Sequence, residues 1–245
     1  MESINKEYLT RDQLLQYEEF QHQIKYSKIF KLNDIKSNHN LVKTIVIDSL
    51  YQYEIPKLVN DLSLCKDLII LQIDLSKSYV EHKGFQQICQ SLSKCLKLSV
   101  LHLNFSQISL SEMSMLCLGN SLKKCTIVLD LNLNLMQNSH HQEGFNLIAE
   151  GILQMKSLFK LKIAYYDISS LLDKIHNLQN IQILDLDMHK LNLSNLTVNI
   201  KKLKILYFIV VHLQQVFFIY ENQIIKTLKT NLRRCKRLVK YKLSF

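Results

Sequence analysis

The sequence predicts an α/β solenoid of about seven to eight stacked strand–turn–helix units. Two observations predict it. An apolar stripe with helical spacing recurs along the chain, and apolar residues two apart, the spacing of a strand, follow each copy. The composition agrees, because apolar residues make up 47% of the 245 residues and can fill a large core.

The helical stripe is anchored on residues that stand 30 apart, beginning with Cys65 and Cys95. Apolar residues lie 3, 7 and 10 positions before each anchor, as Leu92, Ile88 and Phe85 do before Cys95. These offsets place all four side chains on one face of a helix. The six anchors of this kind are Cys65, Cys95, Cys125, Met155, Leu178 and Cys235.

A short strand is predicted after each helix, with two inward-facing residues two positions apart. Between successive strands the spacing runs from 22 to 35 residues. The 22- and 23-residue units leave room for only a short helix or an irregular turn, and the longest unit requires an insertion near 211–222. The first inward positions are predicted at Thr44, Leu71, Leu101, Leu129, Leu161, Leu184, Leu206 and Tyr241.

The run Leu98-Ser-Val-Leu-His-Leu-Asn-Phe-Ser-Gln-Ile108 resembles the leucine-rich repeat, L-x-x-L-x-L-x-x-N-x-L. Unit lengths near 28 to 30 are similar to the ribonuclease-inhibitor-like subclass, and the composition is similar to expanded ciliate repeat families, some of which carry kinase domains. The resemblance covers about 41–245. It implies a horseshoe with parallel strands on the concave face and helices on the convex face, and it implies no activity. Only Asn134 matches the consensus asparagine, so the turns are expected to loosen toward the C-terminus.

Two regions are predicted: an N-terminal helical cap over 1–40 and a leucine-rich-repeat domain over 41–245. The pattern Thr10-Arg-Asp-Gln13 is typical of a helix start. Residues 203–220 are apolar enough for a membrane span, but His212 and two glutamines interrupt them, so a buried strand and its exit are favoured. The polar N-terminus indicates an intracellular, cytoplasmic protein.

Catalytic motifs are not recognisable in the sequence. The four glycines are too scattered for a phosphate-binding loop, and the kinase motifs and G-x-S-x-G are absent. No C-x-x-C pair occurs, and His140-His141 with Glu143 is interpreted as a polar loop, so neither a metal nor a cofactor is expected. The anchor cysteines are expected to act as small buried hydrophobic residues. The sequence therefore predicts a protein that is not an enzyme.

A partner surface is predicted on the concave face, where acidic side chains outnumber one lysine and apolar anchors follow the strands. Such a face suits a protein partner, possibly a basic one. Its predicted polar residues are Asp74, His102, Asn104, Asp130, Asn132, Lys162, Asp185 and Asp187. Its predicted apolar anchors are Phe105, Tyr165 and Met188.

The net charge of +10 lies in the C-terminal end, because residues 200–245 hold 11 Lys and Arg and one acid. This end predicts either a solvated cap or a surface for nucleic acid or an acidic partner. Its named residues are Lys226, Lys229, Arg233, Arg234, Lys236 and Arg237.

Three functions follow. A non-catalytic protein-interaction module is favoured over nucleic-acid or acidic-partner binding through the basic end, and over a regulatory piece of a larger, kinase-type protein.

Overall fold

The computed structural model describes residues 44–47, 52–76, 78–189, 199–200, 202–203, 206, 208–213, 226, 230, 232 and 240–244. The predicted cap over 1–40 lies outside these residues. Of the insertion predicted near 211–222, residues 211–213 belong to a strand instead, and residues 214–222 lie outside the described residues. Within the described part of the chain, eight strands form one parallel sheet in sequence order. The strands are β1 (Thr44–Ile47), β2 (Ile70–Asp74), β3 (Val100–Asn104), β4 (Asp130–Asn134), β5 (Lys160–Ala164), β6 (Ile183–Met188), β7 (Phe208–Leu213) and β8 (Lys240–Ser244).

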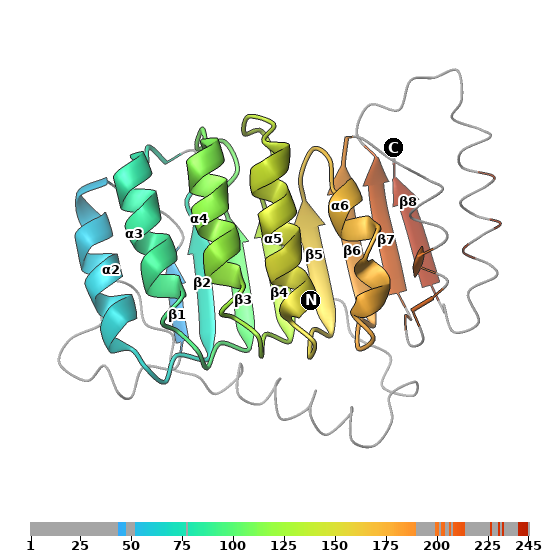
Figure 1. Ribbon diagram of the computed structural model, residues 1–245, viewed down its shortest axis with the longest axis horizontal. Coiled ribbons are helices and arrows are strands. Elements are labelled where there is room, and N and C mark those ends of the chain that lie inside the picture. The colour runs from blue at the N-terminus through green and yellow to red at the C-terminus, as the bar shows by residue number, and fades with distance from the viewer. Residues whose placement is uncertain are drawn as a thin grey trace.

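Helices connect the strands and lie in a row over one face of the sheet (Figure 1). The helical elements are η3 (Gln52–Glu54), α2 (Ile55–Leu64), α3 (His82–Leu92), α4 (Glu112–Leu122), α5 (Gln142–Gln154), α6 (Ser169–Leu172) and η4 (Ile175–Asn177). From β1 to β6, the predicted alternation of strands and helices is confirmed. The short α6 and η4 occupy the 23-residue unit between β5 and β6, as the sequence predicted.

The core lies between the helix layer and the sheet. Leu101 and Leu103 of β3 point into it and are fully or almost fully buried, as are Leu118 and Leu122 of α4. One continuous apolar cluster runs through the successive units, so each unit is stabilised by its neighbours.

The predicted strand register is right at β2, β3, β5, β6 and β8 and wrong at three strands. In β1, Ile45 and not Thr44 pairs with Leu71; in β7, Ile209 and not Leu206 occupies the equivalent position. In β4, Leu131 pairs with Leu101, so the unit from β3 to β4 keeps the full 30 residues. The cause is a lack of contrast: β1 is entirely β-branched, and leucines alternate from 129 to 135, so apolar spacing alone does not fix the register.

Three helices approach one another closely because their contact positions hold very small residues. A Cβ atom at Gly144 of α5 would lie 2.5 Å from Cβ of Met115 on α4, and one at Gly119 would lie 2.7 Å from the backbone carbon of Leu147. At equivalent positions between α3 and α4, the Ser121 hydroxyl donates a 2.7 Å hydrogen bond to the Cys89 carbonyl. Small residues at the helix contacts therefore fix the spacing of the units.

No helix among the described residues has the length and apolar character to cross a bilayer. Residues 208–213, inside the apolar stretch 203–220, form β7, which confirms the predicted strand there.

Candidate functional site: the polar face of the sheet

Alternate residues of each strand point away from the helices and form a surface that we call the polar face. In β2 to β6 its side chains are Gln72 and Asp74, His102 and Asn104, Asp130, Asn132 and Asn134, Lys160 and Lys162, and Asp185 and Asp187. The parallel pairing places His102 beside Asn132, and Asn132 beside Lys162. The structure therefore brings the predicted polar residues of the concave face together on one surface.

A chain of polar contacts crosses the first half of this face. Gln72 Nε2 and His102 Nδ1 are 3.3 Å apart, and His102 Nε2 is 3.3 Å from Asp130 Oδ1. Lys160 then donates a 3.1 Å hydrogen bond to Asp130 Oδ2. Three strands thus hold the Asp130 carboxylate between an imidazole and an ammonium group. Lys160 belongs to this group, although the sequence analysis did not select it.

The second half repeats the arrangement around Asp185. Lys162 Nζ lies 3.2 Å from Asp185 Oδ2, and His212 Nε2 lies 3.5 Å from Asp185 Oδ1. The face therefore presents two groups of the same composition, each with one carboxylate, one lysine and one histidine. This distribution corrects the predicted acidic strip, because cationic partners accompany Asp130 and Asp185.

Burial and hydrogen bonding act in opposite directions on the Asp130 carboxyl. Burial alone would raise its pKa, but His102 and the Lys160 ammonium together outweigh burial and lower it. Asp130 is therefore held as an anion on a nearly buried part of the face.

The carboxyl ends of the strands are fixed by side chains that cap the following turns. Asp74 Oδ1 accepts a 2.8 Å hydrogen bond from the Ser76 backbone N–H, and Asn104 Nδ2 donates a 2.9 Å bond to Asp74 Oδ2. Burial alone would raise the pKa of the Asp74 carboxyl, but the hydrogen bonds from Ser76 and Asn104 outweigh burial and lower it. The Asp74 and Asn104 side chains thus also have a structural role.

The predicted apolar anchors are not on the surface: Phe105, Tyr165 and Met188 are each at most 1% exposed. The physical reason is that strand alternation turns each of them inward, like the residue two before it: Phe105 and Tyr165 directly follow β3 and β5, and Met188 is the last residue of β6. Phe105 packs edge-to-face on Phe85, with ring centroids 5.1 Å apart. The prediction that these three side chains contact a partner is wrong.

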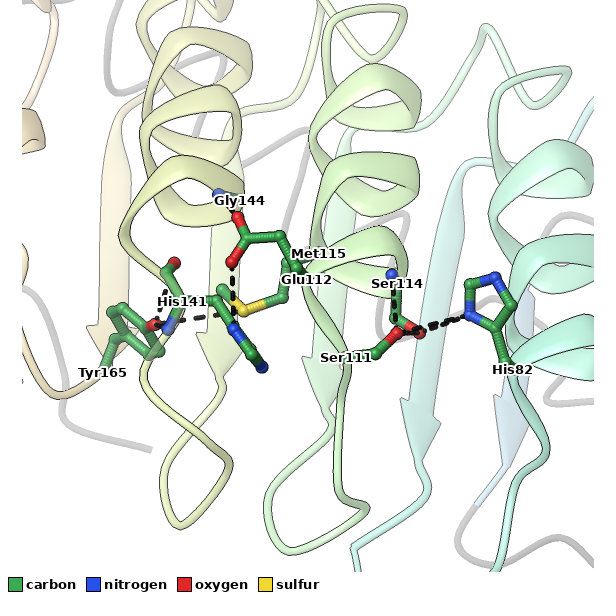
Figure 2. A network of polar contacts seen from close by, with 8 residues as sticks. All are labelled: His82, Ser111, Glu112, Ser114, Met115, His141, Gly144 and Tyr165. Carbon is green, nitrogen blue, oxygen red and sulfur yellow. Dashed lines mark hydrogen bonds and ion pairs between the residues drawn. The ribbon is translucent and has the colours of Figure 1, made fainter.

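Tyr165 instead organises the entry to α5 (Figure 2). Its hydroxyl accepts a 2.8 Å hydrogen bond from the His141 N–H and donates a 3.2 Å bond to the His141 carbonyl. Its ring stacks on Phe145 at 4.5 Å, and burial raises the pKa of its phenol. The Glu112 carboxylate lies 2.9 Å from His141 Nδ1 and also accepts the Gly144 N–H. His141 therefore pairs with Glu112, which the sequence had not linked to it.

A serine–histidine contact lies beside this network, at the start of α4 (Figure 2). His82 Nδ1 is 2.9 Å from Ser114 Oγ, an arrangement also found in nucleophilic catalysis. Ser114 is only 3% exposed, however, and the Ser111 hydroxyl accepts its backbone N–H in an N-cap. Because the Ser114 hydroxyl is buried, it is not accessible to a substrate. The geometry therefore supports helix capping and not nucleophilic catalysis.

Asn138 is a structural residue that the sequence analysis missed. Its Nδ2 donates to the carbonyls of Phe105 and Leu135 at 2.7 and 3.0 Å. Its Oδ1 accepts from the backbone N–H groups of Ile108 and Leu110 at 3.2 and 3.0 Å. Asn138 thus joins two successive loops, whereas Asn134, the predicted consensus asparagine, lies on the polar face and caps only its own turn.

The anchor cysteines are buried, as predicted. Burial raises the pKa of the Cys65 thiol to about 11 and those of Cys95 and Cys125 to about 12, so they remain neutral. Cys235 lies outside the described residues. No group of three or more potential ligands for a metal ion occurs in the described ranges.

Of the predicted basic end, only Lys226 is described, and it is exposed. Lys229, Arg233, Arg234, Lys236 and Arg237 lie outside the described residues, so binding through this end stays a prediction. Comparison of the chain with protein-family models and with curated proteins finds no match.

Proposed function

We propose that this chain is a non-catalytic protein-interaction module of the leucine-rich-repeat type, which binds a protein partner through the polar face. The single observation that carries the proposal is the cross-strand network on that face, from Gln72 to Lys160 and from Lys162 to His212. Neighbouring strands hold these side chains in place, so little conformational entropy is lost when a partner binds.

The chemistry of the partner follows from the charge pattern. Each central carboxylate has a lysine on a neighbouring strand, and Lys162 is 47% exposed at its side chain. A partner with alternating acidic and basic or amide groups would satisfy both members of each pair, whereas a uniformly basic surface would be repelled by Lys160 and Lys162. This refines the sequence-based expectation of a basic partner.

The experiment is an exchange of charges within one pair. The double variant Lys162→Glu with Asp185→Lys keeps the ion pair but reverses the pattern that the partner meets. A matched control, Lys123→Glu with Glu150→Lys, reverses a 2.8 Å pair on the helix layer. We expect the wild type to capture protein partners from nuclease-treated native lysate and to be crosslinked to them at Lys162. These partners should be lost in the first variant and retained in the control.

The proposal is wrong if capture survives the Lys162/Asp185 exchange while circular dichroism shows both variants folded. Partners that disappear on nuclease treatment would also contradict it and would favour nucleic-acid association.

A further inference from the structure

Large exposed apolar side chains gather at two opposite edges of the structure. The strand-carboxyl edge is where strands end and helices begin; the strand-amino edge is where helices end and strands begin. Every exposed large apolar side chain of the described residues lies on one of them. The strand-carboxyl edge carries Tyr53, Tyr79, Met113 and Tyr166, and the strand-amino edge carries Leu64, Leu96 and Ile127.

The two edges have opposite charge. Helix N-termini favour carboxylates and C-termini favour cations, and all units point the same way, so charge separates along the whole row. The strand-carboxyl edge carries Glu54, Glu81, Glu112 and Glu143, with Lys57 and Lys83 among them. The strand-amino edge carries Lys66, Lys94, Lys97, Lys124 and Lys156, with Asp67 paired to Lys97.

Successive units have the same spacing at both edges. The register from β2 to β5 advances by 30 residues per strand, so loops at one edge and turns at the other recur with one common distance between units. The edge of a second copy therefore has the same spacing between units, so the two edges can match along their whole length. Aliphatic turn residues such as Leu96, which is 60% exposed, would meet exposed aromatic rings such as Tyr79, which is 76% exposed.

One aromatic ring on the strand-carboxyl edge is already fixed in position. The Tyr166 ring stacks on His189 with centroids 5.5 Å apart and lies 4.9 Å from the His140 ring. It remains 46% exposed. A ring that is both fixed and exposed loses little freedom in a contact, as interface anchors do.

We propose that copies of this chain associate edge to edge, with the strand-carboxyl edge of one copy against the strand-amino edge of the next. The contact joins two different surfaces, so each copy keeps one edge available and the assembly grows instead of stopping at a dimer. It does not use the polar face, so it is independent of the proposed function.

The test uses two variants that each disable one edge. Tyr79→Ser with Glu81→Lys alters the strand-carboxyl edge, and Leu96→Asp with Lys94→Glu alters the strand-amino edge. All four positions are exposed, so both variants should fold, which circular dichroism checks. By light scattering at low salt, we expect the mass of the wild type to rise with concentration and each variant alone to stay monomeric. A mixture of the two should form dimers, because one intact edge of each kind remains.

A control variant, Asn120→Asp with Asn146→Lys, alters exposed positions on the helix layer and should assemble like the wild type. Added salt should weaken assembly through screening. The proposal is overturned if the wild type stays monomeric at every concentration, if either edge variant assembles like the wild type, or if the mixture yields no dimer.

Discussion

The Glu112 carboxylate, in the first turn of α4, lies 2.9 Å from Nδ1 of His141, in the loop that leads into α5. The same carboxylate accepts a hydrogen bond from the Gly144 N–H of α5. His141, the N-cap residue of α5, makes no capping hydrogen bond with its own side chain. A side chain from the preceding unit therefore supplies the cap of α5, which couples the two units.

Replacement of Glu112 tests this coupling. Glu112→Ala removes both the ion pair and the acceptor for the α5 N-terminus, and we expect the free energy of unfolding to fall by about 1–2 kcal/mol, as for a lost N-cap. Urea denaturation measures it. The control Glu143→Gln changes an exposed carboxylate in the first turn of α5 itself and should cost under about 0.5 kcal/mol. Equal losses in the two variants would contradict the coupling.

Gly144→Ala tests the close approach of α4 and α5. Alanine favours a helix over glycine by about 1 kcal/mol, but the new Cβ would meet Cβ of Met115 at 2.5 Å. Overpacking of this kind costs about 1–3 kcal/mol, so we expect net destabilisation, measured as a lower midpoint of thermal unfolding. The double variant Gly144→Ala with Met115→Ala should not recover the loss, because alanine keeps the Cβ atom that the new methyl group meets and leaves a cavity in place of the buried Met115 side chain. A rise in the midpoint for Gly144→Ala alone would show that the helices separate without cost.

The repeat architecture was accessible from sequence because it depends on spacing. Thirty-residue intervals around Leu71, Leu101 and Leu161 predicted the strand order and the alternation with helices, and the structure confirms both. The register failed where neighbouring residues were of similar character, as at the β-branched Thr44 and Ile45, since period two then marks no preferred face.

The candidate site was predicted only in part. Polar residues between inward leucines, such as His102 and Asp185, do lie on the polar face. Tyr165 was misplaced because an aromatic residue after a strand was read as a surface anchor, although alternation turns it inward. Contacts such as that between Glu112 and His141 join neighbouring units through side-chain orientations, which no local motif reveals.

Asn138 provides a test of the loop contacts. Asn138→Ala removes two donors and two acceptor contacts from half-buried backbone groups, and we expect a loss of about 2–4 kcal/mol in the free energy of unfolding. Asn138→Asp keeps the oxygen that accepts from Ile108 and Leu110 but places a carboxylate oxygen against the Phe105 and Leu135 carbonyls, so it should cost at least as much as alanine. The comparison is made by chemical denaturation at neutral pH. If Asn138→Ala left the free energy of unfolding unchanged, water would be replacing these hydrogen bonds at no cost.

The pH dependence of stability should depend on Asp130. Its folded-state pKa is lowered from 3.8, so its ionised form stabilises the native state. That contribution is fully present above the unfolded-state pKa and disappears as the pH falls through the folded-state value. We expect Asp130→Asn to lower the free energy of unfolding by about 1–3 kcal/mol near pH 7, the range for hydrogen bonds to charged groups, and the difference from wild type to shrink below pH 4.

Two side chains face Asp130 from neighbouring strands, the His102 imidazole on β3 and the Lys160 ammonium on β5. Repeating the comparison in a His102→Gln background separates them, because only the Lys160 contact then remains. The measurement is a series of urea titrations between pH 7 and acid pH. A constant difference between Asp130→Asn and wild type across this range would mean that the carboxylate charge contributes nothing, and that Asp130 acts only through its shape and neutral hydrogen bonds.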